Sequence, residues 1–361
     1  MAFAAKVKSL DDNKFYTVVD RPLGKKVVKA KWVLRRKVLP GGKLDKLKAR
    51  IVAKGFTQRE GIDYEETFSP TVRFESVRLM VVAAAADGLH THHMDVTTAF
   101  LYASLDEEVY MELMEGMQGY GVPGKVAKLQ RAIYGLKQAS RMRNLHIDNI
   151  LNDMGFVRLS ADHGVYFKWD GANRVWLALY VDDIFLTGHN LSNIEAVKKT
   201  LGIDMKVKDL GMAKYLLGIE LRRRQLGMED GDIFMVQEKY VLEILLQFDM
   251  VGCKAASTPL EPGVKMSVVD SPEDDEGKAQ MEAYPYRQVV GKLMYLAVCS
   301  RPDISQAVSE LSRFNANPGM KHWESAVRVM RYLSGTAGMG LLYKRGASKD
   351  LWGYVDASHT S

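Results

Sequence analysis

Cysteine is scarce in this sequence, and long apolar runs are missing from it. The 361 residues include only Cys253 and Cys299, too few for a disulfide framework or a four-cysteine zinc site. The longest apolar run, LMVVAAAA at 79–86, is far shorter than the ~20 residues that span a bilayer. The opening MAFAAKVKSL lacks a signal-peptide core, and no internal repeat is found. These features predict an intracellular protein of a reducing compartment, without a membrane segment.

Composition and length indicate a globular chain of more than one domain. Hydrophobic residues make up 47% and charged residues 26% of the sequence, which is enough to bury a sizeable core. At the usual ~100 to 200 residues for each domain, the length predicts two or three domains.

Positive charge is concentrated at the N-terminal end. Residues 1–60 carry 17 Lys and Arg against 5 Asp and Glu, whereas the other 301 residues carry 33 against 39. Within that end, basic residues alternate with Val, Leu and Trp32 around PGG at 40–42, a pattern typical of a basic β-hairpin. Such a hairpin suits a polyanion such as a nucleic-acid backbone or a triphosphate. A solvated lysine-rich face would give the same pattern.

Hydrophobic periodicity divides the rest of the chain into strands and helices. Helices are expected at 74–88, within 126–155, at 191–205, at 240–250, at 302–318 and at 322–335. A strand that begins at 89 is expected to run into a helix that ends at 101. Two strands around a turn are expected at 164–188, a hairpin at 214–240, and single strands at 340–346 and 351–358. The acidic segment 266–282 has few large apolar residues and is the best linker candidate.

Two adjacent carboxylates interrupt the apolar stretch LALYVDDIFLTG at 177–188. Burying Asp182 and Asp183 without compensation would cost several kcal/mol each, so they must face water, a cation or a metal. Asp95 also lies where a strand ends, and a fold that pairs the two strands would gather three carboxylates. Such a cluster suits two magnesium ions, with manganese as a substitute. An ordinary Asp-Asp hairpin turn is the alternative.

Three histidines near Asp95 do not predict a metal site. Successive side chains of a strand point to opposite faces, so His90 and His92 would face away from His93 and Asp95. The 19 methionines are expected to fill the core.

Several sequence blocks together resemble a known family. YVDD at 180–183, MDVTTAFL at 94–101 and AIYGLKQA at 132–139 are similar to the palm motifs of the reverse transcriptase in copia-type, Pseudoviridae-like long-terminal-repeat retrotransposon Pol polyproteins. Further similar blocks run through most of the chain: KARIVAKGFTQREGIDYEETFSPTVR, DLGMAKYLLGIEL, YRQVVGKLMYLAVCSRPDISQAVSELSRF, RVMRYLSGT and GYVDAS.

The resemblance implies an α+β right-hand polymerase with fingers, palm and thumb, and a C-terminal connection region leading into a truncated RNase H-like domain. The implied divisions are fingers 1–90, palm 91–205, palm end and thumb 206–265, acidic linker 266–282, connection helices 283–345 and RNase H start 346–361. The first RNase H carboxylate would be Asp356. Because Val355 and Ser358 depart from the family pattern and the chain ends soon after, we expect no RNase H activity.

The resemblance also implies roles for individual residues. Asp95, Asp182 and Asp183 would be the catalytic metal ligands. The expected nucleotide and primer contacts are Lys48 and Arg50 at the triphosphate, Phe100 as the residue that rejects a ribose 2′-hydroxyl, Gln138 over the incoming nucleotide, and Tyr180 near the primer end. Lys48 or Arg50 could instead contact a template phosphate, and Phe100 could be a core phenylalanine.

The implied function is RNA-directed DNA synthesis by two-metal nucleotidyl transfer, with magnesium as cofactor. The implied partners are deoxynucleotides and an RNA or DNA template with its primer, in a cytoplasmic virus-like particle or the nucleus. One departure bears on this function: Arg143 stands where the family usually has tryptophan, and a buried charge there could cost ~3 kcal/mol or more. An inactive, truncated transposon-derived fragment that at most binds nucleic acid is one alternative, and a captured binding module with a structural role is the other.

Overall fold

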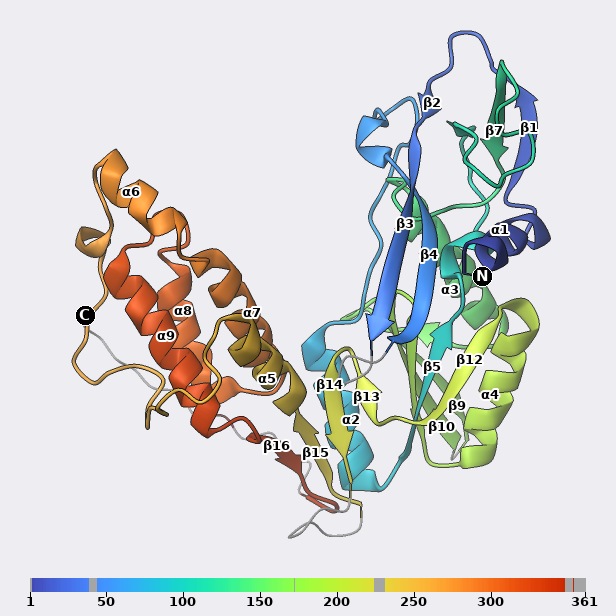
Figure 1. Cartoon of the computed structure of the whole chain (residues 1–361). Coiled ribbons are helices and arrows are strands. Elements are labelled where there is room, and N and C mark those ends of the chain that lie inside the picture. The colour runs from blue at the N-terminus through green and yellow to red at the C-terminus, as the bar shows by residue number, and fades with distance from the viewer. Residues whose placement is uncertain (1, 39–43, 172, 224–230, 348–352, 354–361) are drawn as a thin grey trace. The chain divides into compact units, whose positions relative to one another are not determined.

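The chain folds into two compact units, shown in Figure 1. The computed structural model describes residues 2–38, 44–171, 173–223, 231–347 and 353. Unit 1 comprises Met1–Arg73 and His92–Gly211, and unit 2 comprises Phe74–Thr91 and Met212–Ser361. The expected PGG turn, the last expected strand and Asp356 with its neighbours lie outside the described residues. In the part of the chain that is described, no helix is both long and apolar enough to cross a membrane.

A six-stranded sheet forms the base of unit 1, in the order β12-β5-β11-β10-β9-β8. Its strands are β5 (His90–Val96), β8 (Val157–Arg158), β9 (Val165–Asp170), β10 (Asn173–Tyr180), β11 (Asp183–Gly188) and β12 (Val207–Met212). Alternate residues such as Leu177, Leu179 and Ile184 point into one core with helices α3 (Ala139–Asp153) and α4 (Leu191–Asp204). The two helices therefore cover one face of the sheet.

A second part of unit 1 carries the basic hairpin (Figure 1). The hairpin is formed by β3 (Ala30–Val38) and β4 (Leu44–Ala53), which pair antiparallel. A four-stranded sheet in the order β1-β7-β6-β2 lies in the same unit. Its strands are β1 (Tyr16–Asp20), β2 (Val27–Val28), β6 (Tyr110–Met111) and β7 (Lys125–Leu129), accompanied by α1 (Ala2–Asp12) and the 3₁₀ turns η1 (Gly55–Thr57) and η2 (Ala99–Tyr102). Residues of the hairpin, this sheet and η2 share one core, which includes Ile51, Phe100 and Met111.

Unit 2 combines a small sheet with a set of helices. The sheet has the order β13-β14-β15-β16, with strands β13 (Tyr215–Leu216), β14 (Ile219–Arg222), β15 (Ile233–Val236) and β16 (Gly340–Tyr343). The helices are α2 (Phe74–Asp87), α5 (Glu238–Gln247), α6 (Asp275–Glu282), α7 (Tyr286–Cys299), α8 (Ser305–Ser312) and α9 (Met320–Gly335), with turns η3 (Val268–Asp270) and η4 (Pro302–Ile304). The apolar faces of α5, α7, α8 and α9 meet in one core.

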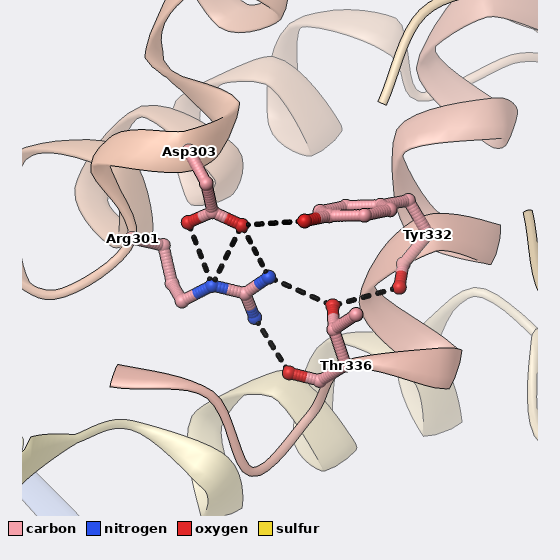
Figure 2. A network of polar contacts seen from close by, with 4 residues as sticks. All are labelled: Arg301, Asp303, Tyr332 and Thr336. Carbon is pink, nitrogen blue, oxygen red and sulfur yellow. Dashed lines mark hydrogen bonds and ion pairs between the residues drawn. The ribbon is translucent and has the colours of Figure 1, made fainter. Parts of the chain in front are cut away.

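A buried arginine joins η4 to the end of α9 in unit 2, as Figure 2 shows. Arg301 is 1% exposed, and all three of its guanidinium nitrogens donate hydrogen bonds. Nε and Nη2 bond to the Asp303 carboxylate at 2.7–3.2 Å, while Nη1 and Nη2 reach the Thr336 carbonyl and hydroxyl at 2.9 and 2.7 Å. The Tyr332 hydroxyl donates to the same carboxylate at 2.9 Å. The charge is thus fully paired where water is excluded.

The structure differs from the sequence-based expectation in two segments. Residues 266–282, expected to be a linker, contain η3 and α6. Lys321 and Asn317 bond to Asp270 and to the Pro272 carbonyl, respectively, at about 3 Å, so polar contacts order a segment that has few apolar residues. In the stretch 126–155, the expected helix is present as α3, but it is preceded by an unexpected strand, β7 (Lys125–Leu129), which pairs with β1.

Candidate active site

Asp182 lies in the tight turn between β10 and β11. Tyr180 pairs with Asp183 across the two strands, which leaves Val181 and Asp182 as the loop residues. Val181 has a φ of 48°, a left-handed conformation that is strained for a β-branched side chain and costs about 1–3 kcal/mol. The turn therefore holds both aspartates at the end of the hairpin at a cost in backbone strain.

Asp95 reaches the same end of the sheet on β5, which lies beside β11. The backbone N–H of Val96 donates to the Asp182 carbonyl at 2.8 Å, so the C-terminal end of β5 abuts the turn. Thr98, with a φ of 59°, then diverts the chain into η2. Asp95, Asp182 and Asp183 are all half-buried, and all three lie at this end of the sheet.

The Asp182 carboxylate is only partly satisfied. Its Oδ2 accepts a hydrogen bond from the Tyr134 hydroxyl at 3.2 Å, whereas its Oδ1 is buried without a hydrogen-bond partner among the described residues. Burial raises the pKa of Asp182 above its ordinary value, and the negative charges of Asp95 and Asp183 raise it further. The positive charge of Arg143 and the Tyr134 bond oppose this rise. A buried carboxylate oxygen without a partner is costly, so this side chain is suited to receive a cation.

Arg143 on α3 is the buried positive charge of this region. It is 5% exposed, which confirms the expectation of a buried charge at this position. Burial lowers its pKa to about 10, and the largest opposing effect is attraction to Asp182. Its Nη2 is buried and has no hydrogen-bond partner in the described part of the chain. The guanidinium thus contributes charge to the carboxylates without bonding to them.

His93 binds the third carboxylate. Its Nε2 lies 2.8 Å from Oδ1 of Asp183, and the ring is 9% exposed. Strand alternation placed His93 on the same side as Asp95, so the signal for this contact was in the sequence, although alternation alone does not indicate a bond to Asp183.

Tyr134 connects the carboxylates to the basic hairpin. The Arg50 guanidinium lies 5.2 Å from the centre of the Tyr134 ring, and Phe100 meets that ring edge-on at 4.6 Å between centroids. Burial and the negative charge of Asp182 raise the pKa of Tyr134 to about 12, so the hydroxyl keeps its proton at neutral pH. Tyr134 lies within the AIYGLKQA block, but no residue pattern indicated which side chains it would touch.

A close approach of two backbone segments positions Tyr134. The Ala53 N–H donates to the Tyr134 carbonyl at 2.8 Å, and the Gly55 N–H donates to the Gly135 carbonyl at 3.1 Å. A Cβ on Gly55 would lie 2.0 Å from the Gly135 oxygen, and one on Gly135 would lie 2.1 Å from the Ala53 oxygen. Only glycine allows this contact, which seats Tyr134 against β4.

The remaining expected site residues fall into two groups. Lys48 and Arg50 share one face of β4, since side chains alternate along a strand, and both are half-buried; Tyr180 is half-buried beside the turn. Gln138, in contrast, is fully buried. Its Oε1 accepts from Gln58, and its Nε2 donates to the Asp63 carbonyl and to Glu107 at 3.0–3.2 Å. Contact between Gln138 and a nucleotide would require these bonds to break.

The carboxylates fit a hard divalent cation by their chemistry. Their oxygens are the ligands that magnesium and manganese prefer, and the Asp182 Oδ1 is available. Over the described ranges, however, no three His, Cys, Asp or Glu side chains are gathered closely enough to hold a metal ion. Tyr134 and His93 occupy one oxygen each of Asp182 and Asp183, so these two donors must yield or share when a metal binds.

Much of this sequence is shared with known proteins. The family model of the reverse transcriptase (RNA-dependent DNA polymerase) matches residues 13–262. The chain is 40% identical over 357 residues to the retrovirus-related Pol polyprotein from transposon TNT 1-94 of Nicotiana tabacum, covering 99% of this chain and 27% of that protein. It is 35% identical over 266 residues to a putative transposon Ty5-1 protein of Saccharomyces cerevisiae, covering 74% of this chain and 83% of that protein.

A solved structure of the foamy viral protease-reverse transcriptase in complex with double-stranded DNA aligns with a TM-score of 0.46 at 10% identity, over 92% of this chain and 48% of that one. The chain spans about a quarter of the length of the tobacco polyprotein. Its family model covers more than half of its residues, and its relatives are transposon proteins of plants and yeast. The resemblance drawn from the sequence motifs is therefore confirmed, and the chain belongs to the reverse transcriptase (RNA-dependent DNA polymerase) family of transposon Pol proteins.

Proposed function

We propose that this chain carries RNA-directed DNA polymerase activity, with catalysis at the carboxylates of the β10–β11 turn and the end of β5. The observation that carries the proposal is the Asp182 carboxylate, half-buried beside Asp95 and Asp183, with a buried oxygen that has no partner among the described residues. A fold that places three carboxylates at one end of a sheet, two of them at a strained turn, does so at a cost in stability. That cost is understandable if a cation binds there during function.

Asp95, Asp182 and Asp183 would hold magnesium, with manganese as a substitute. When bound, the metal lowers the pKa of an attacking hydroxyl and neutralises the charge on a leaving pyrophosphate. The chain itself orients the carboxylates: the Tyr134 hydroxyl fixes Asp182, and His93 fixes Asp183. Both contacts restrict carboxylate rotation before substrate arrives.

The substrate contacts in this proposal follow the positions of the side chains. Lys48 and Arg50 on β4 supply positive charge for a triphosphate or a template phosphate. Phe100 is 6% exposed and packs edge-on against Tyr134 in the core of unit 1, so it would act against a ribose 2′-hydroxyl only if the structure opens around its ring. Tyr180 would lie near the primer end. Gln138 contacts the nucleotide only after release from Gln58 and Glu107.

The larger assignment rests on the family. We propose fingers at 1–90, palm at 91–205, palm end and thumb at 206–265, connection helices at 283–345 and the start of an RNase H-like region at 346–361. The partners would be deoxynucleotides and an RNA or DNA template with its primer, in a virus-like particle or the nucleus.

The test is magnesium-dependent primer extension on poly-rA with an oligo-dT primer. We expect the purified chain to extend the primer and Asp182→Asn to lose at least about a thousandfold in rate, because it removes a charged metal ligand. Asp153→Asn is the matched control, since Asp153 is exposed on α3 of the same unit, and it should extend normally.

Two results would count against the proposal. Equal extension by Asp182→Asn and the wild type would place catalysis elsewhere. Tight primer-template binding with no extension by the wild type would favour an inactive transposon-derived fragment or a binding module instead.

A further inference from the structure

We propose that Arg143 is a resident counter-cation of the carboxylate cluster, which makes this chain bind its divalent metal ion more weakly than Asp95, Asp182 and Asp183 would without it. The inference rests on the proposed function, because it assumes that the metal binds at these carboxylates. It adds a residue that tunes metal affinity from outside the ligand set.

The first observation is that Arg143 is buried and its Nη2 has no hydrogen-bond partner among the described residues. Only 5% of the residue is exposed. Buried arginines are normally paired, because an uncompensated charge is costly. Arg301 of unit 2 illustrates the usual solution, with hydrogen bonds from all three guanidinium nitrogens. The Arg143 guanidinium is instead stabilised by attraction to nearby negative charge.

The second observation is that those surroundings are the carboxylates. Attraction to Asp182 is the strongest favourable charge interaction of Arg143, and Asp183 contributes as well. From the other side, Arg143 is the leading influence that favours the charged form of Asp182. Neither side chain forms an ion pair within 4.0 Å among the described residues, so the two charges act on each other without a direct bond. In a poorly hydrated interior, two charges influence each other more strongly than they would in water, even when they are not in contact.

The third observation is that the guanidinium and the carboxylate each have one buried atom without a hydrogen bond. Nη2 of Arg143 and Oδ1 of Asp182 both lack a hydrogen-bond partner in the described part of the chain, so no described donor competes with a cation for that carboxylate oxygen. A divalent cation bound there would be repelled by the guanidinium. The guanidinium also relieves part of the repulsion among the carboxylates before any metal arrives. Both effects reduce the free energy gained on metal binding.

The experiment measures metal affinity directly, without substrate. Free Mn²⁺ is counted by electron paramagnetic resonance during titration of the full chain, for the wild type, Arg143→Met, Arg143→Gln and Arg143→Lys. We expect both neutral variants to bind Mn²⁺ about tenfold more tightly than the wild type, and the lysine variant to stay within about threefold of it. Two neutral variants keep the test decisive if one of them fails to fold.

The matched control is Arg141→Met, which removes the same charge from the same helix. Arg141 is partly exposed, where solvent screens its charge, so its removal should leave Mn²⁺ affinity unchanged. Thermal melting provides a second readout: Mn²⁺ should raise the melting temperature of Arg143→Met more than that of the wild type.

The outcomes separate this inference from the proposed function. If Asp182→Asn binds Mn²⁺ as tightly as the wild type does, the metal does not bind at the carboxylates and both proposals fail. If Asp182→Asn weakens binding but Arg143→Met and Arg143→Gln bind no more tightly than the wild type, only the counter-cation inference is overturned.

Discussion

Among the described residues, each unit buries one arginine near an aspartate, and the two arginines differ in their hydrogen bonds. In unit 2, Arg301 makes hydrogen bonds of 2.7–3.2 Å to Asp303 and to Thr336. Although burial alone would raise it, these bonds and that of Tyr332 hold the pKa of Asp303 below its ordinary value. In unit 1, burial and the neighbouring carboxylates raise the pKa of Asp182, despite the nearby Arg143.

The difference separates a structural charge network from a functional one. A network that serves only stability satisfies each polar group, because any unsatisfied group is a cost. A site that must receive a cation has to leave part of its ligand set open. Asp182 Oδ1 and Arg143 Nη2, which have no hydrogen-bond partner among the described residues, fit that requirement.

Removing Arg301 should have the largest effect on stability. Arg301→Met removes the guanidinium donors from Asp303, which keeps only its bond from Tyr332, and from the Thr336 carbonyl. We expect the unfolding free energy of unit 2 to fall by about 3–5 kcal/mol. Urea denaturation followed by circular dichroism measures this. Arg313→Met is the control: its ion pair with Glu310 is largely exposed and should contribute less than about 1 kcal/mol. Similar losses for both variants would mean that the network is not a special stabilising element.

Neutralising the corresponding charges of unit 1 should have the opposite sign. In Asp182→Asn/Arg143→Met, a buried charge that lacks hydrogen bonds is removed together with the carboxylate it faces. We expect the metal-free double variant to be about 1–4 kcal/mol more stable than the wild type, measured by the same urea denaturation. A loss of several kcal/mol would show instead that unit 1 depends on its charges as unit 2 does.

Two tyrosines offer a matched pair, since each hydroxyl donates to an aspartate of its unit. Tyr332→Phe should cost about 1 kcal/mol of stability and leave primer extension unchanged. Tyr134→Phe should slow extension by about tenfold in kcat, with KM for deoxynucleotide nearly unchanged, because Asp182 loses the bond that orients it. An unchanged kcat in Tyr134→Phe would remove Tyr134 from the positioning of Asp182.

The smallest expected effect is a pH dependence of unit 2. His322 accepts a hydrogen bond from the Gly319 N–H and faces the Ser267 carbonyl, and burial lowers its pKa, with Asp270 and Lys321 as its charged neighbours. Below its ordinary value of 6.5, the unfolded chain therefore binds a proton that the folded chain does not. Stability should fall as pH drops from 7 to 5, by less than about 1.4 kcal/mol per pH unit.

His322→Gln should show a flatter dependence in thermal melts across that range. The same slope in the variant and the wild type would assign the pH dependence to other groups.

Much of the candidate site could be predicted from local patterns. The carboxylates at 182 and 183 stood out because they interrupt an apolar strand, and alternation placed His93 with Asp95. Hydrophobic periodicity likewise predicted the helix after Gln138 and the hairpin of β10 and β11. The placement of Gln138 was not predicted, because its bonds to Gln58, Asp63 and Glu107 join segments that are far apart in the chain. The order of the segment 266–282 was also not predicted, because Asp270 and Pro272 bond to Lys321 and Asn317, which lie far along the chain.

The sequence motifs were enough to identify the family and to predict the aspartate set, and short-range spacing was enough to predict the alternation of the strands. Only the folded structure decided which oxygen of Asp182 is open, which ring holds the other, and why two buried arginines differ. Burial and pairing depend on residues brought together from distant parts of the chain. A guanidinium among hydrogen-bond acceptors stabilises the fold, whereas one that faces carboxylates without bonding to them sets the charge that an incoming metal ion meets.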